Sequence, residues 1–124
     1  MRYSRQIVFN EIGAKGQEKL SESAVAIVGI GALGTVSAEL LARAGVGHLI
    51  LIDRDVVELS NLQRQSLFDE DDVNKPKTLQ AYNKLRKINS EIKIDFYIED
   101  LNHENIDKRT SEEQCCHFVS VFAR

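Results

Sequence analysis

Three glycines and one acid carry the first chemical signal in the sequence. Gly29, Gly31 and Gly34 follow one apolar run, and Asp53 ends the next. Such glycines form a tight turn, admit a phosphate close to the backbone and let a helix pack closely on a strand. The N–H groups at the helix start attract anions, and an acid like Asp53 accepts hydrogen bonds from ribose hydroxyls. The stretch predicts a nucleotide site; the alternative is a purely structural glycine turn.

A second group of polar residues follows the acid. Asn61, Gln63 and Arg64 lie in residues 54–65, a stretch too polar for a core strand. Arginine offers a forked set of donors that matches phosphate oxygens. An exposed loop with a surface arginine is the alternative. Lys77 lies in the first turn of a predicted helix, where the helix dipole repels a cation unless an anionic ligand compensates. We therefore hypothesise that Lys77 contacts phosphate.

The elements that position these residues form an α/β pattern. Residues 24–28 and 49–52 are short apolar runs without polar alternation, as expected for parallel strands covered on both faces. The sequence between them predicts a helix that buries one apolar stripe. That stripe comprises Leu33, Val36, Leu40, Leu41 and Ala44. The pattern predicts a Rossmann-like, doubly wound parallel sheet.

The remaining elements are read from shorter patterns. In residues 2–21 we expect helical turns that are broken at Gly13 and Gly16. The four consecutive acids of residues 69–72 indicate a solvated loop. A helix is expected from about Lys77 to about Ile88. Its inward residues are Leu79, Tyr82, Leu85 and Ile88. Residues 92–98 alternate in polarity, which predicts a half-buried outer strand.

The composition of the chain limits the kinds of binding partner and the cellular location that we expect. The chain has 124 residues, 43% of them hydrophobic, and a net charge of −3, so neither nucleic acid nor an anionic membrane is the default partner. No stretch approaches the ~20 apolar residues that span a bilayer, and we expect a cytoplasmic protein. Cys115 and Cys116 are adjacent, and no Cys-x-x-Cys pair is present, so we expect inert thiols and no zinc site. The three histidines show no spacing that suggests a shared metal.

Several motifs together resemble the ThiF/MoeB/HesA family, the bacterial relatives of the ubiquitin-activating enzymes. They are the 2–6 stretch Arg-Tyr-Ser-Arg-Gln, the glycine loop, the 44–47 stretch Ala-Gly-Val-Gly, Asp53, the 60–65 stretch Ser-Asn-Leu-Gln-Arg-Gln and the 75–77 stretch Lys-Pro-Lys. The resemblance implies an enzyme that uses Mg-ATP to adenylate the C-terminal glycine of a ubiquitin-like sulfur-carrier protein. The product serves molybdopterin or thiamine synthesis, and pyrophosphate is released.

The resemblance also implies a role for each matching residue. Asp53 would hold the ribose, and the backbone of Gly31 and Ala32 would approach the phosphates. Asn61, Arg64 and Lys77 would bind the phosphates and steady the transition state, and Gln63, in the same motif, would also belong to the cofactor site. Arg5 matches the family arginine that reaches into the neighbouring subunit's site. A homodimer is therefore implied.

The sequence departs from the family at its end. Family members are about twice as long and carry a further strand that ends in a magnesium-binding Asp, whereas residues 114–124 contain neither Asp nor Glu. We expect one truncated domain: a helical segment (1–23), a Rossmann-like half (24–108) and an atypical tail (109–124). A genuine short variant of the family is the alternative. Such a chain would bind ATP weakly and adenylate poorly. Strand 24–28 would be an open edge unless residues 118–122 or another subunit cover it. An NAD(P)-dependent reductase and a non-catalytic dimerisation fragment are the alternatives.

Overall fold

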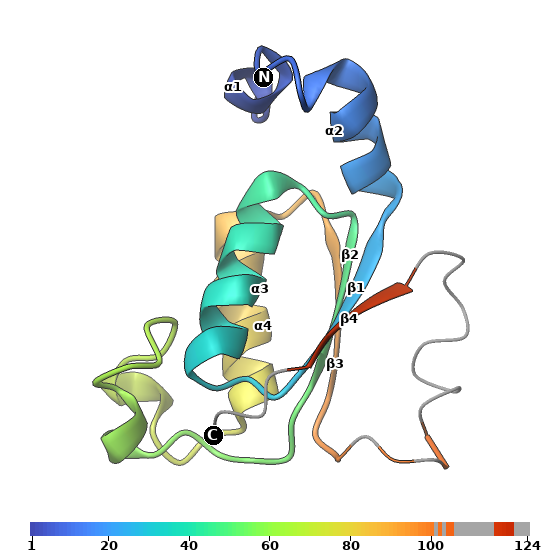
Figure 1. Cartoon of the computed structure of the whole chain (residues 1–124). Coiled ribbons are helices and arrows are strands. Elements are labelled where there is room, and N and C mark those ends of the chain that lie inside the picture. The colour runs from blue at the N-terminus through green and yellow to red at the C-terminus, as the bar shows by residue number, and fades with distance from the viewer. Residues whose placement is uncertain (101, 103, 106–115, 121–124) are drawn as a thin grey trace.

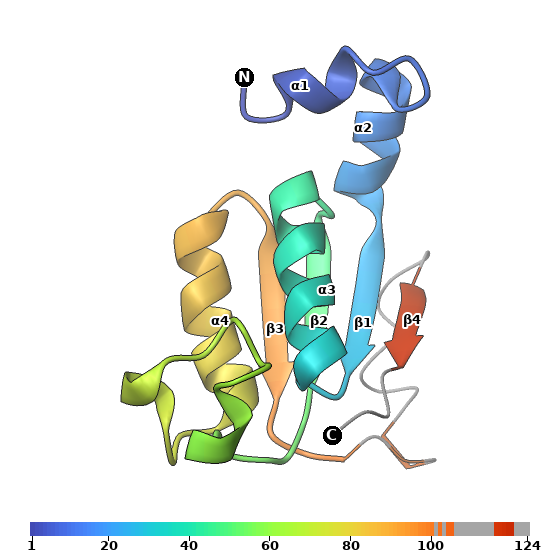
Figure 2. The ribbon, with the colours of Figure 1, turned by 60° about the vertical axis from the view of Figure 1, so that its left-hand side comes forward.

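The computed structural model describes residues 1–100, 102, 104–105 and 116–120, and its strands form one four-stranded parallel sheet in the order β3-β2-β1-β4 (Figures 1 and 2). The elements in chain order are α1 (Ser4–Ile7), α2 (Gly13–Glu22), β1 (Ala24–Val28), α3 (Ala32–Ala44), β2 (His48–Ile52), the 3₁₀ turns η1 (Leu59–Asn61) and η2 (Glu70–Asp72), α4 (Lys77–Ile88), β3 (Lys93–Tyr97) and β4 (Cys116–Ser120). The predicted Rossmann-like parallel sheet is confirmed.

The two central strands are apolar because both of their faces are covered. Val25, Ile27, Leu49 and Leu51 point toward one face, where they form a common core with residues of α3 and α4. Figure 2 shows both helices lying side by side over this face of the sheet. On the opposite face, Ala26, Ile50 and Ile52 form a second buried cluster, with Val28 and Tyr97 packed against it.

Strand β1 is paired along both of its edges. β2 pairs with one edge and β4 with the other, both in parallel register. The expectation that residues near 118–122 could cover the open edge is thus met by β4, over residues 116–120. The rest of the predicted tail and the thiol of Cys115 lie outside the described residues. Pairing on both edges leaves β1 as a rigid support for the glycine loop that follows it.

The face that α3 buries is not the predicted one. Leu33, Val36 and Leu40 are 58%, 41% and 61% exposed, and Leu41 and Ala44 are half-buried. The helix instead buries a row of small residues against the sheet. They are Gly34, Thr35, Ala38 and Ala42. The prediction was wrong because small side chains let a helix axis approach a sheet closely, so the face with the larger side chains turns outward.

Two other predictions about local structure were wrong. Gly16 does not break a helix but lies within α2, where Gln17 is buried and ties the helix to the carbonyl oxygen of Ala44 at 3.1 Å. These tertiary contacts offset the intrinsic cost of a helical glycine, about 1 kcal/mol. Residues 69–72 are not a wholly solvated loop, because Asp72 is only 2% exposed.

Helix α4 and strand β3 follow their predicted patterns closely. α4 ends at Ile88 as expected; Leu85 is buried, and Tyr82 and Ile88 pack against the core. Leu79 is half-buried. β3 forms the expected edge of the sheet beyond β2. Within the described residues, no helix is long and apolar enough to cross a bilayer.

Candidate functional site

The glycine loop joins β1 to α3 through two positions that accept only glycine. Gly29 has φ of +92°, a conformation that residues with a Cβ rarely adopt. A Cβ on Gly34 would lie 2.0 Å from the carbonyl oxygen of Gly29. Gly31 precedes the first residue of α3 without a side-chain cap, so the helix start is left to backbone N–H groups. The loop therefore has the geometry of an anion site.

Asp53 links this loop to the loop that follows β2. Its Oδ2 accepts a hydrogen bond from the backbone N–H of Ile30 at 2.7 Å, and its Oδ1 accepts one from Asp55 at 2.8 Å. The side chain is half-buried. Each carboxylate oxygen has a second lone pair, so Asp53 can still accept a hydrogen bond from a ligand hydroxyl. It fixes two loops and remains an acceptor.

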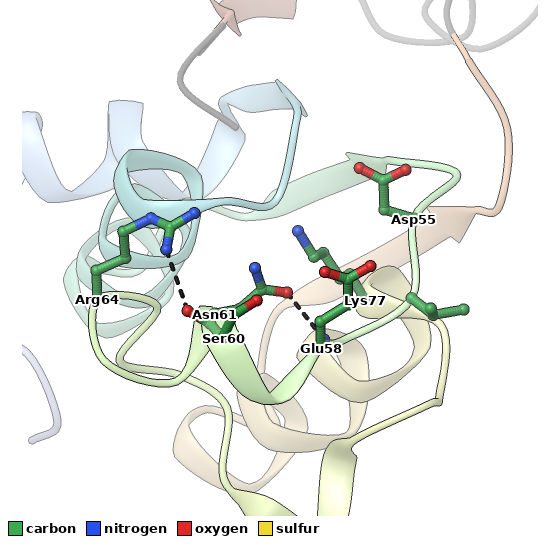
Figure 3. A pocket seen from close by; sticks show the side chains of 7 residues that line it. Asp55, Glu58, Ser60, Asn61, Arg64 and Lys77 are labelled. Carbon is green, nitrogen blue, oxygen red and sulfur yellow. Dashed lines mark hydrogen bonds between the residues drawn. The ribbon is translucent and has the colours of Figure 1, made fainter.

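Beside these loops lies a cavity of about 350 Å³, which we call the Lys77 pocket (Figure 3). Its lining comes from the loop after β2 and from the start of α4. It consists of Asp55, Val56, Glu58, Ser60, Asn61, Arg64 and Lys77. Asn61 is held in place because its Oδ1 accepts a hydrogen bond from the backbone N–H of Glu58 at 2.8 Å. Arg64 donates to the carbonyl oxygen of Ser60 at 3.2 Å and is otherwise exposed.

Lys77 is the unusual member of the lining. The residue is only 5% exposed, and its ammonium has no hydrogen bond or ion pair to any described residue. Its backbone N–H donates to the carbonyl oxygen of Asp55 at 3.0 Å, which fixes the start of α4 against the pocket wall. Burying an unpaired charge is unfavourable unless a counter-ion arrives. With Arg64 in the same pocket, Lys77 favours an anionic ligand that carries more than one charged oxygen.

A second buried charge lies close by in sequence but has partners. Burial alone would raise the pKa of Asp72, but hydrogen bonds from the Asp69 backbone, Gln80 and Lys84 outweigh it and hold the pKa below 3.8. Burial would lower the pKa of Lys84, and its bonds to Asp69 and Asp72 raise that pKa above 10.5. Both groups are therefore charged at neutral pH, as an ion pair.

Comparison with known protein families gives a match over most of the chain. Residues 3–116 match the ThiF family. The chain belongs to the ThiF family.

Specific relatives of this ThiF-family chain are considerably longer. It is 54% identical over 107 residues to the sulfur carrier protein ThiS adenylyltransferase of Bacillus subtilis, covering 85% of this chain and 32% of that protein. It is 44% identical over 122 residues to the molybdopterin-synthase adenylyltransferase of Haemophilus influenzae, covering 98% and 46%. The crystal structure of E. coli MccB with ATP is similar with a TM-score of 0.78 at 39% identity, covering 88% and 34%. The chain thus spans less than half the length of these proteins.

In this ThiF-family chain, the structure brings together only some of the residues predicted for the site. Asn61, Arg64 and Lys77 line one pocket. Gln63 is exposed and lies outside the lining. The glycine loop, with Gly29, Gly31, Ala32 and Gly34, and Asp53 also lie outside the lining, although Asp53 bonds to Asp55, which is part of it. Arg5 is exposed on α1, at the other end of the sheet (Figure 1).

Sequence reasoning missed part of the pocket and its surroundings. Asp55, Glu58 and Ser60 lie in the polar stretch of residues 54–65. The order of polar and apolar residues in this stretch does not show which side chains face the pocket. Gln65 and Thr78 follow directly after the pocket residues Arg64 and Lys77. Both are fully buried, and no described residue bonds to the side-chain nitrogen or oxygen of Gln65 or to the Thr78 hydroxyl.

Proposed function

We propose that this chain is the nucleotide-binding part of an ATP-dependent adenylyltransferase that activates the C-terminal glycine of a ubiquitin-like sulfur-carrier protein. The observation that carries the proposal is Lys77, a lysine only 5% exposed whose ammonium has no counter-ion among the described residues and which shares a pocket with Arg64 and Asn61. The names of the Bacillus subtilis and Haemophilus influenzae relatives support the reaction and point to thiamine or molybdopterin synthesis. ATP in the E. coli MccB crystal structure supports the choice of nucleotide.

The reaction requires alignment and charge neutralisation more than acid–base catalysis. The carrier's carboxylate oxygen forms a bond to the α-phosphorus of ATP, the bond from that phosphorus to the bridging oxygen breaks, and pyrophosphate leaves with the electron pair. A carboxylate is already a nucleophile, so no general base is needed. Arg64 and Lys77 would neutralise the charge of the phosphates, Asn61 would help to orient them, and Asp53 would accept hydrogen bonds from the ribose. The backbone at Gly31 and Ala32 would approach the phosphates.

The described residues offer carboxylates beside the pocket but no cluster of metal ligands. Among them, no three His, Cys, Asp or Glu side chains converge to hold a metal ion. Asp55 and Glu58 are the carboxylates of the pocket lining, but Glu58 caps η1 by accepting a hydrogen bond from the backbone of Asn61. We therefore assign no step of the reaction to a residue-bound Mg²⁺.

We propose further that two copies of the chain associate, so that Arg5 serves the partner's pocket. Tyr3 and Gln6 anchor the N-terminal segment to the body: the Tyr3 hydroxyl accepts a hydrogen bond from Asn89 at 2.8 Å, and Gln6 donates to the carbonyl oxygen of Ala44 at 3.0 Å. Arg5, between them, is left exposed. The exposed leucine and valine stripe of α3 supplies an apolar surface for the second copy.

Calorimetry and isotope exchange test the proposed function. We expect the chain to bind ATP and not NAD. Exchange of labelled pyrophosphate into ATP should be weak and should occur only when a carrier protein ending in glycine is present. A carrier whose final glycine is deleted is the matched control. Binding of NAD in place of ATP would refute the proposal, and a chain that binds neither nucleotide would refute any nucleotide role for the pocket.

A further inference from the structure

A buried carboxylate on the loop before α4 ties that loop to the helix. The side chain of Asp72 is 3% exposed. Its Oδ2 accepts hydrogen bonds from the backbone N–H of Asp69 at 2.8 Å and from Lys84 at 3.1 Å. Its Oδ1 accepts one from the side chain of Gln80 at 2.7 Å. Gln80 and Lys84 are one turn apart on α4, so one carboxylate holds η2 against two successive turns of the helix.

The chain between this carboxylate and Lys77 forms part of the support for the pocket. Residues 73–76, which we call the linker, pair with the pocket wall through their backbone. Asn74 donates to the carbonyl oxygen of Val57 at 2.8 Å, and Val57 donates to that of Lys75 at 2.9 Å. Val56 and Pro76 form an antiparallel bridge. The linker is therefore held at one end by Asp72 and at the other by the bond from Lys77 to Asp55.

This arrangement matters because the ammonium of Lys77 has no partner of its own. No described residue bonds to its ammonium, so the position of that group depends on the backbone that carries it. A buried ion pair such as Asp72–Lys84 adds little net stability compared with apolar side chains of similar volume. Its contacts instead join the η2 turn to α4 through Asp69, Gln80 and Lys84.

We infer that Asp72 is a positioning residue for the Lys77 pocket: through Gln80 and Lys84 it fixes the linker, and thereby the positions of Lys77 and of wall residues 55–57. The inference rests on the proposed function only in taking ATP as the ligand of this pocket. Asp72 itself is absent from the pocket lining.

The test replaces Asp72 by asparagine. Asn74, Val57 and the pocket residues are unchanged, but one carboxylate oxygen becomes an NH₂ group that faces donors on both sides, so at least one bond to Asp69, Gln80 or Lys84 is lost. We expect the affinity for ATP, measured by calorimetry, to fall about tenfold, the effect of losing about one well-placed charged contact. Asp71→Asn is the matched control. It removes the same charge from the neighbouring exposed residue, and it should leave the affinity unchanged.

A second measurement separates positioning from general loss of stability. Amide hydrogen exchange should accelerate at Val57, Asn74 and Lys77, whose N–H groups join the linker to the wall. Protection of the β1 and β2 amides should stay as in the unsubstituted chain. Gln80→Ala is a milder variant that keeps the Asp72–Lys84 pair. It should change affinity and exchange in the same direction but to a smaller extent, and it decides the question if Asp72→Asn does not fold.

The outcomes distinguish this inference from the proposed function. Failure of the unsubstituted chain to bind ATP overturns the proposed function; the positioning role is then judged on inorganic tripolyphosphate, by the same variants and the same exchange measurement. Normal binding with unchanged affinity in Asp72→Asn and Gln80→Ala overturns the positioning role alone. Loss of protection throughout the sheet would also overturn it, because Asp72 would then only stabilise the fold.

Discussion

Two regions of α4 carry buried or half-buried lysines in opposite circumstances. In the first turn, Lys77 is 5% exposed, and its ammonium has no partner among the described residues. Two turns later, the side chain of Lys84 is 28% exposed and contacts both Asp69 and Asp72. The comparison teaches that the fold supplies counter-charges where a cation serves structure, and leaves one uncompensated where we propose a ligand.

The largest expected effect comes from removing the unpaired charge. Lys77→Met keeps most of the side-chain volume, and we expect it to weaken ATP binding about 10- to 100-fold, the effect of losing a charge-assisted contact of about 1.5–3 kcal/mol. The free energy of unfolding should not fall, because no counter-charge is abandoned. Calorimetry and chemical denaturation measure the two quantities. Lys75→Met, at an exposed position two residues earlier, is the control, and equal effects of both variants would contradict the assignment.

Removing the paired lysine should act on stability first. Lys84→Met leaves the buried carboxylate of Asp72 without its cation, and we expect the free energy of unfolding to fall by about 3 kcal/mol. Arg43→Met breaks the surface pair with Glu39 on α3, where both side chains are more exposed, and should cost about 0.5 kcal/mol. Urea denaturation compares the two. A cost for Lys84→Met as small as that for Arg43→Met would mean that the Asp72–Lys84 pair behaves like a surface pair.

The pH dependence of unfolding sharpens the same contrast. Because bonds to Asp72 hold its folded-state pKa below 3.8, its contribution to stability is complete above pH 3.8 and is lost as the pH falls through the folded value. Lys84 has a folded-state pKa raised above 10.5, so its contribution is complete below pH 10.5 and is lost as the pH rises through the folded value. Asp72→Asn should flatten the acidic limb of a denaturation–pH profile. An unchanged acidic limb would mean that other groups cause the loss of stability at low pH.

The smallest expected effect concerns the buried amide next to the pocket. Gln65 is fully buried, and no described residue bonds to its side-chain nitrogen or oxygen. Gln65→Met should raise the free energy of unfolding by about 1 kcal/mol, because it removes an unsatisfied buried polar group at similar volume. Gln63→Met, at an exposed position in the same motif, should change it by less than about 0.5 kcal/mol. Destabilisation by Gln65→Met would show that the amide makes bonds that matter.

The parts of the fold that depend on local sequence could be predicted. β1 and residues 49–52 of β2 are continuous apolar runs, and the need for glycine at Gly34 follows from the loop motif and the close approach to Gly29. The buried face of α3 could not be found by counting large apolar residues. Close packing on a sheet selects small side chains such as Ala38 and Ala42, and hydrophobicity alone does not encode that distance.

The candidate site was predictable to a similar extent. Asn61, Arg64 and Lys77 stood out by residue type, by the position of Lys77 at a helix start and by the family motif. The pairing of Asp72 with Lys84 could not be predicted. Lys84 lies twelve residues later in the chain, and nothing in the sequence shows which of the four acids of residues 69–72 it contacts. That pairing depends on how the loop folds back on α4, which is a tertiary property.

The strand order has a consequence for how a second substrate would approach. Winding proceeds from β1 through β2 to β3, while β4 lies on the other side of β1, so the direction of winding reverses at the carboxyl end of β1. Open α/β sheets receive their ligands in the crevice at such a topological switch point. The glycine loop starts there, so under the proposed function the switch point is where the ATP phosphates and the flexible tail of the carrier protein would meet.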